Sequence, residues 1–257
     1  MAPGAHRGNA LPPPQPRTPA EQGKPIGSDS PRLVAVVIDD VGFDESMALE
    51  FANLGLPMTF AILPHQRYSL TLASRLRAMG HEVILHLPMQ PVGRPGSDPG
   101  EGAVTEGLSR DEIRAIVAGD LESVPGAVGL NNHMGSRATT DPILMRSVLE
   151  VARERGLYFL DSRTTSATVA YDLALEMGIP AARRGVFLDD RRERSYIEAQ
   201  VRSLLERART EGFALAIGHP DQATLEALKE STGLLRSPDI RMVPASTLAG
   251  GGGQGAG

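Results

Sequence analysis

The sequence lacks cysteine and tryptophan altogether, and only 4% of its 257 residues are aromatic. The absence of cysteine excludes disulfide bonds, thiolate metal sites and cysteine nucleophiles. With so few rings, any stacking surface for a sugar or a base would depend on Tyr and Phe alone. No apolar run approaches the ~18 residues of a membrane-spanning helix, and no signal-peptide pattern is present.

An excess of positive charge is also missing. The formal net charge is −5 and the isoelectric point is about 5.7, whereas nucleic-acid-binding proteins usually carry a basic patch. Hydrophobic residues make up 41% and charged residues 22%, which is typical of a soluble globular protein. We therefore expect a globular protein that does not bind nucleic acid.

Large apolar residues are scarce at both ends of the chain. Residues 1–31 include the proline-rich stretch LPPPQPRTP, and residues 249–257 are mostly glycine. Such segments bury too little apolar surface to offset the entropy lost on ordering, so both are predicted to be disordered. Proline-rich spacers often join a domain to a membrane anchor. We therefore expect a periplasmic or cell-envelope protein, with a membrane tether through an N-terminal anchor that this sequence does not contain.

Residues 32–248 form a single predicted domain in which apolar runs alternate with amphipathic stretches. The predicted strands are 33–38, 58–63, 82–86, 128–130, 157–160, 185–188, 213–217 and 240–243. The predicted helices are 44–54, 68–79, 109–124, 142–155, 166–177, 193–209 and 222–234. This alternation predicts an α/β fold with a parallel sheet, and the number of units favours a deformed (β/α) barrel of seven to eight parallel strands. A doubly wound open sheet is the alternative, and residues 88–107 are predicted to be a long loop.

Polar residues collect where the predicted strands end. They are Asp39, Asp40, His65, His86, Asn131, Asn132, His133, Asp161, Arg163, Asp189, Asp190 and His219. In a barrel, the carboxyl ends of the strands form the face that carries the active site. Four of the six histidines belong to this set, whereas His81 precedes a strand and is expected on the opposite face. The clustering predicts a site, whatever the role of each residue.

The stretch LHLPMQ, residues 85–90, raises the question of a metal. His86 and Gln90 have the spacing of a His-x-x-x-His motif, but a neutral amide is a poor zinc ligand. We predict that His133, which follows the next strand, supplies the missing imidazole. The alternative is that His133 lies in a turn held by asparagine side chains.

Asp39 and Asp40 end a strongly apolar strand, and two unpaired carboxylates cannot both face an apolar core. Neighbouring residues of an extended segment point to opposite sides, so one carboxylate could ligate a metal while the other contacts a bound water. The alternative is a helix cap and an arginine pair. His219, between a glycine and a proline, is expected near the mouth of the barrel, where an imidazole suits proton transfer.

Three further positions are interpreted from their neighbours. Asp161 and Arg163 are predicted to form a pair, either one that orients a catalytic group or a plain salt bridge. Asp189 and Asp190 precede two arginines and are interpreted as a solvated charge cluster, with a site role for Asp189 as the lesser alternative. His65 is predicted to belong to a pocket wall or the surface.

Six motifs in order resemble the divergent polysaccharide deacetylase family, a separate branch of the NodB-type deacetylases. They are IDDVG (38–42), AILP (61–64), HLPMQP (86–91), NNHMGS (131–136), FLDSRTT (159–165) and AIGHP (216–220). The resemblance covers nearly all of residues 33–247. It implies a deformed β/α barrel and a divalent metal, usually zinc, held by one Asp and two His; manganese, cobalt and nickel also suit such ligands.

The resemblance also implies roles for individual residues. By position, Asp39 would be the general base, Asp40 and His86 metal ligands, and His219 the general acid. The family's second histidine ligand falls at Gln90, so His133 is assigned as a ligand on the argument from the strand ends. The candidates for substrate-binding or orienting roles are Gln90, Arg137, Asp161 and Arg163.

The implied reaction is metal-dependent removal of N- or O-linked acetyl groups from an envelope carbohydrate. A non-catalytic envelope barrel that binds glycan or protein and keeps a metal site is the main alternative. Gln90 favours this alternative, whereas the retained Asp39, Asp40 and His219 favour the enzyme. A metal hydrolase acting on a phosphoester is the third possibility.

Overall fold

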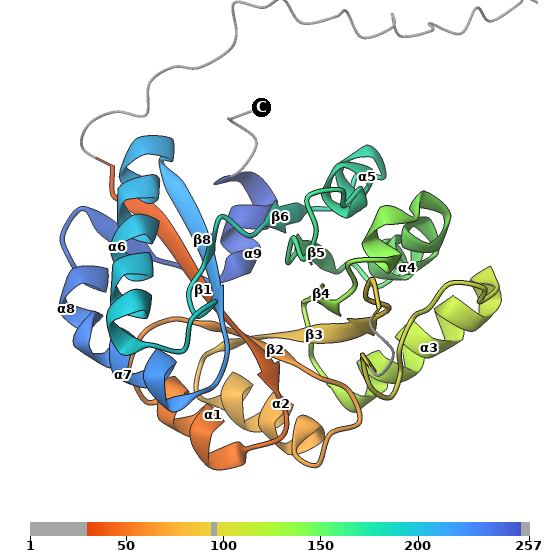
Figure 1. Cartoon of the computed structure of the whole chain (residues 1–257), viewed down its shortest axis with the longest axis horizontal. Helices are drawn as coiled ribbons and strands as arrows, with labels where there is room; N and C mark the ends of the chain where they lie inside the picture. Colours follow the sequence, from red (N-terminus) through yellow and green to blue (C-terminus); the bar gives the residue numbers. More distant parts are fainter. Residues whose placement is uncertain (1–29, 94–96, 253–257) are drawn as a thin grey trace, which may run out of the picture.

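The described residues form one curled, parallel sheet wrapped by helices (Figure 1). The computed structural model describes residues 30–93 and 97–252. The strands are β1 (Arg32–Val41), β2 (Thr59–Ile62), β3 (Glu82–Met89), β4 (Gly129–Met134), β5 (Tyr158–Asp161), β6 (Ala181–Arg183), β7 (Val186–Phe187), β8 (Phe213–Gly218) and β9 (Ile240–Met242). The predicted disorder of residues 1–29 and 253–257 lies outside the described residues.

Helices follow most strands and cover the outer face of the sheet (Figure 1). They are α1 (Glu45–Ala52), α2 (Ser69–Ala78), α3 (Arg110–Ser123), α4 (Pro142–Glu154), α5 (Ala170–Glu176), α6 (Arg194–Glu211), α7 (Gln222–Glu230), α8 (Thr232–Leu235) and α9 (Ala245–Thr247), with the 3₁₀ turn η2 (Ala138–Thr140) and the π-helical turn η3 (Leu248–Gly252). Within the described residues, no helix is both long and apolar enough to span a membrane.

The strand order is β6-β5-β4-β3-β2-β1-β8-β7, and β9 pairs with the first residues of β1. Among the described residues no ladder joins β6 to β7, so the sheet is a half-barrel with an open seam between these two strands. The predicted deformed (β/α) barrel is therefore confirmed, and the doubly wound alternative is not. We call the two ends of the barrel its amino end and its carboxyl end, after the direction in which the strands run.

Alternation along β1 separates two apolar layers, because successive side chains of a strand point to opposite faces. Val34, Val36 and Ile38 pack outward against the helices. Ala35 and Val37 point into the barrel, where their neighbours include small side chains such as Ala61.

The C-terminal segment closes the amino end of this interior. Val243, Ala245, Leu248 and Ala249 pack inside the barrel. The backbone N–H of Ala245 donates to Thr59 Oγ1 at 2.9 Å, and that of Ser246 donates to Glu82 Oε1 at 3.1 Å. These contacts fill the interior at the amino end of the barrel.

Three sequence expectations need correction. The short strand β6 is not among the predicted strands, because its AAR sequence follows a proline and carries no apolar run. Residues 88–107 are not one loop, because β3 continues to Met89 and the fully buried Val104 pairs with it. Disorder does not begin at residue 249, because η3 runs to Gly252 and Ala249 is buried in the barrel.

Candidate active site and metal centre

The site residues continue the inward-facing positions of the strands. Asp39 follows Ala35 and Val37 in the alternation along β1. His86 follows Ile84 on β3 in the same way, and His219 follows Leu215 and Ile217 of β8. Their side chains therefore extend the inner layer to the carboxyl end of the barrel, where the apolar lining changes into a polar one.

Asp40 reaches the same place only because β1 is irregular there. Regular alternation would turn its side chain toward the outer helices. Instead Asp40 has a φ of 54°, and the register between β1 and β2 shifts between Ile38 and Val41. A non-glycine residue in this region costs ~1 kcal/mol or more, and such strain concentrates at functional sites. The expectation that the two carboxylates diverge is therefore wrong, since both lie near one imidazole.

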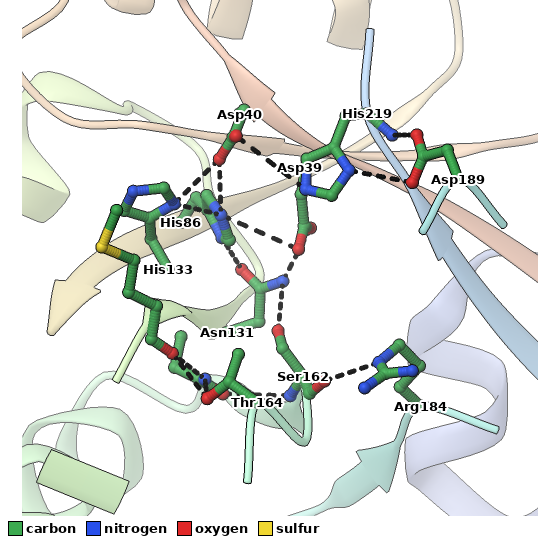
Figure 2. Close-up of polar contacts among 12 residues, drawn as sticks. Asp39, Asp40, His86, Asn131, His133, Ser162, Thr164, Arg184, Asp189 and His219 are labelled. Atoms are coloured by element: carbon green, nitrogen blue, oxygen red, sulfur yellow. Dashed lines mark hydrogen bonds and ion pairs between the residues drawn. The ribbon is translucent and has the colours of Figure 1, made fainter. Parts of the chain in front are cut away.

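Three ligand atoms converge above this strand end (Figure 2). Asp40 Oδ1 lies 2.8 Å from His133 Nδ1 and 3.1 Å from His86 Nε2. The two ring nitrogens are themselves 3.1 Å apart. Donors bound to one tetrahedral zinc at 2.0–2.2 Å would be separated by about 3.3 Å. The spacing and chemistry of this triangle thus fit a divalent metal ion.

Asn131, on β4, orients two members of the site at once. Its Nδ2 donates to Asp39 Oδ1 at 2.8 Å, and its Oδ1 lies 2.7 Å from His86 Nδ1. The Asn131 oxygen can only accept, so His86 Nδ1 donates to it and His86 Nε2 faces the ligand triangle. A hydrogen bond from the second ring nitrogen is the usual way in which proteins orient a metal-binding histidine.

The two carboxylates have different electrostatic environments. Burial raises the pKa of Asp39, even though His86 and His219 act in the other direction. For Asp40, burial also acts to raise the pKa, but hydrogen bonds from His133 and His86 outweigh it and lower the pKa. Asp40 therefore stays ionised near neutral pH, whereas Asp39 has a raised proton affinity.

His219 approaches the triangle from the opposite wall, held by Asp189 (Figure 2). Its Nδ1 lies 3.0 Å from Asp189 Oδ1, and its Nε2 lies 3.8 Å from Asp40 Oδ2. Burial acts to lower the pKa of His219, but the hydrogen bond and charge of Asp189, with Asp39 and Asp40, raise it to about 9. The imidazole is thus a proton donor near neutral pH.

The interpretation of Asp189 as a solvated charge is wrong. Its side chain is buried and accepts hydrogen bonds from the backbone of His219 at 2.6 Å and from Thr224 Oγ1 at 3.0 Å. Only its neighbour Asp190 is exposed. The sequence pattern could not separate the two, because the adjacent arginines suggested a surface cluster.

The other predicted site residues make contacts away from the ligand triangle. Gln90 Oε1 accepts from the backbone of Glu106 at 2.7 Å, and Arg137 Nε lies 2.7 Å from Glu106 Oε1. Asp161 binds the backbone N–H of Arg163 at 2.8 Å, without a salt bridge between their side chains in the described part of the chain. His65 pairs with Asp120 on α3 at 2.8 Å.

A cavity of about 690 Å³ opens beside the triangle. Asp39, His86, His133 and His219 form one end of its lining, and Arg163 lies further along it. Gln90 and Arg137 are not among its lining residues. Sequence reasoning missed Arg184 and the residues of α6 that also line the cavity, since nothing in their local pattern points to a site.

A profile of the divergent polysaccharide deacetylase family matches residues 36–249. The chain belongs to the divergent polysaccharide deacetylase family. The uncharacterized protein YibQ of Escherichia coli (strain K12) is 35% identical over 215 residues, which are 84% of this chain and 66% of that protein. The chain thus spans just under two thirds of that relative's length.

Solved structures share the fold of this family member. The uncharacterized protein ATU2773 of Agrobacterium tumefaciens C58 has a TM-score of 0.81 and 21% identity, covering 87% of this chain and 92% of that one. A T48 deacetylase solved with substrate has a TM-score of 0.57 and 14% identity over 86% of this chain and 92% of its own. BA3943 of Bacillus anthracis, a CE4 family pseudoenzyme, has a TM-score of 0.52 and 15% identity over 86% of this chain and 66% of its own.

Proposed function

We propose that the protein is a metal-dependent hydrolase that removes N- or O-linked acetyl groups from an envelope carbohydrate. The observation that carries the proposal is the convergence of Asp40, His86 and His133 into a ligand triangle with a carboxylate and an imidazole on either side. Family membership supports the same reaction class. Periplasmic location and a membrane tether are further proposals, based on the proline-rich segment of residues 1–31.

Asp40, His86 and His133 would hold the divalent ion. When bound, such an ion polarises the acetyl carbonyl and makes a water acidic enough to attack it. Asp39 Oδ2, 3.7 Å from His86 Nε2, would take the proton of the attacking water. The raised pKa of Asp39 suits this transfer.

His219 would supply the second proton. Its Nε2 faces the triangle while its Nδ1 is held by Asp189. With a pKa of about 9, the protonated ring can donate to the leaving nitrogen or oxygen as the acetyl bond breaks. Asp189 fixes the ring orientation and stabilises its charge.

The test is acetate release from N- and O-acetylated glycans by the zinc-loaded protein. Asp39→Asn is expected to lower the rate by roughly 10²–10⁴-fold, the usual contribution of a positioned general base. Its zinc content should stay at the wild-type level. Glu50→Gln, which removes an exposed carboxylate on α1, is the matched control and should have no effect. Equal rates for Asp39→Asn and wild type would remove Asp39 as the base.

A non-catalytic glycan- or protein-binding barrel is the second candidate. Gln90 occupies the position of the ligand expected by family resemblance, and the fold also occurs in a protein described as a pseudoenzyme. Under this hypothesis the metal still binds, glycan binding is measurable, and wild type and Asp39→Asn release equally little acetate.

A further inference from the structure

The cavity beside the ligand triangle extends toward the open seam of the half-barrel. Along its far wall lie the loop after β5, the residues around β7 and one face of α6. The α6 residues of the lining are Tyr196, Gln200, Ser203 and Arg207. Their spacings of three and four residues place them on one side of a helix. The cavity therefore has a polar wall at the place where a further strand would close the barrel.

Three arginines contribute to this part of the lining, namely Arg163, Arg184 and Arg207. A second, smaller cavity of about 90 Å³ shares all three. Arg207 is paired with Glu211 at 3.0 Å. Arg163 has no salt bridge among residues 30–93 and 97–252, and its only carboxylate contact is through its backbone N–H.

Arg184 is fixed in place by its surroundings. Its Nε donates to the carbonyl of Ser162 at 2.6 Å and its Nη2 to that of Arg163 at 2.8 Å. Its guanidinium lies 4.7 Å from the ring centre of Phe187, and that ring lies 5.5 Å from the ring centre of His219. The Phe187 ring therefore lies between the Arg184 guanidinium and His219, the proposed acid.

The lining holds three arginines and two aspartates, so carboxylates offset only part of the positive charge. Burial and the neighbouring Arg163 lower the pKa of Arg184, whereas Asp39, Asp161 and Asp190 act to raise it. Beyond Asp39, the carboxylate in the lining is Asp190, which is exposed. Arg163 also has a φ of 49°, a costly conformation for a long side chain. Guanidinium groups match the paired oxygens of a carboxylate or phosphate better than the single hydroxyl oxygens of a neutral sugar.

We propose that this arginine-lined part of the cavity binds an anionic substituent, a carboxylate or a phosphate, of the acetylated glycan that is bound at the triangle. The planar fork of arginine matches both anions through paired hydrogen bonds. Arg163 and Arg184 are the principal binding residues and Arg207 supports them. The inference rests on the proposed function for the position of the acetyl group, and it narrows the substrate to charged glycans.

The test compares binding of tetrasaccharides of equal length by titration calorimetry with the zinc-loaded protein. One probe is the neutral N-acetylglucosamine tetramer. The second alternates N-acetylglucosamine with N-acetylmuramic acid and carries carboxylates, and the third is the neutral tetramer with a 6-phosphate. Wild type is expected to bind at least one anionic probe about tenfold or more tightly than the neutral one, and the stronger of the two identifies the anion.

Substitutions test whether the preference for anionic probes depends on the arginines of the cavity. Arg163→Gln should abolish the difference between the anionic and the neutral probes, whereas Arg202→Gln, an exposed arginine on the outer face of α6, should preserve it. Asp190→Asn should strengthen anionic binding, because it removes the opposing charge. Equal affinity of wild type for all probes, or an unchanged preference in Arg163→Gln, overturns the inference.

Binding and hydrolysis separate the two proposals. An anionic preference lost in Arg163→Gln, with no acetate release from any probe, would leave the anion site standing and remove the deacetylase. Acetate release at equal rates from neutral and anionic probes that bind with equal affinity would support the deacetylase and remove the anion site.

Discussion

His133 occupies the place of the ligand that we propose in exchange for Gln90. The structure places the His133 nitrogen 2.8 Å from Asp40 and 3.1 Å from the His86 nitrogen, whereas the Gln90 amide is engaged by the backbone of Glu106. The question raised by the LHLPMQ stretch therefore has a structural answer. A strand neighbour, in register through the Pro88–His133 pair, brings in the imidazole that the local motif lacks.

Paired substitutions test this exchange of ligands. His133→Ala is expected to weaken zinc binding by at least 100-fold, because one of three protein ligands is lost. Gln90→Ala should change the affinity by less than about threefold, since its side chain only holds the loop. Competition with a chromophoric chelator measures both. Full affinity in His133→Ala would remove it from the metal site.

Site residues could be predicted from the sequence where a reactive side chain stands at the end of a predicted strand. Asp39, Asp40, His86, His133 and His219 are all reactive side chains at strand ends, and the structure brings them together. Asn131 and Asp189 could not be assigned, because an amide or a carboxylate becomes an orienting group only through its partner. That partner is set by register across the sheet, which no local pattern carries.

Individual elements were predicted well where they have strong local signals. The helices predicted at 109–124 and 142–155 are present as α3, which begins with a capping box of Ser109 and Glu112, and α4, which Asp141 caps ahead of its first-turn proline. Strand β6 has no such signal, because its pairing with β5 determines its conformation. Likewise, the register shift between Ile38 and Val41 near Asp40 has no local sequence signal.

The packing of α3 against the loop after β2 predicts a pH-dependent stability. Asp120 is buried, its Oδ2 lacks a partner in the described residues, and it contacts His65. Burial, opposed by His65 and assisted by Glu101, raises the pKa of Asp120 to about 7. Its pKa is thus higher in the folded than in the unfolded state, so the stability it contributes is present at low pH and lost as pH rises toward 7.

Urea denaturation at pH 5 and pH 8 measures this effect. Relative to Asp120→Asn, wild type should lose roughly 2 kcal/mol of unfolding free energy between the two values, since each pKa unit corresponds to about 1.4 kcal/mol. Glu122→Gln, an exposed carboxylate on the same helix, should follow wild type. Parallel curves for wild type and Asp120→Asn would show that Asp120 is not protonated on folding.

At the scale of the whole molecule, the contacts that fill the amino end of the barrel stabilise the fold. Glu82 Oε1 accepts hydrogen bonds from Thr59 Oγ1 at 2.9 Å, from Tyr158 Oη at 2.9 Å and from the backbone of Ser246 at 3.1 Å. One carboxylate oxygen therefore joins β2, β5 and the C-terminal segment. These contacts were not predictable, because they connect residues as far as 164 positions apart.

Glu82→Ala is expected to lower the free energy of unfolding by about 3 kcal/mol or more, because each buried donor left without a partner costs roughly 1–3 kcal/mol. Glu82→Gln keeps an acceptor oxygen and should cost less than half as much. Chemical denaturation measures both, and zinc affinity should stay unchanged because the site lies at the other end. Equal stability of Glu82→Ala and wild type would show that the C-terminal segment closes the barrel without this contact.

The pairing of β9 with the start of β1 brings the two ends of the domain side by side, with the N–H of Arg32 donating to the carbonyl of Asp239 at 2.8 Å. Neighbouring ends make a fold tolerant of circular permutation. A short linker could join them, and a new start could be opened at the exposed Gly156 turn. The ligand triangle would survive this reordering, since it depends on which strands are neighbours and not on which comes first.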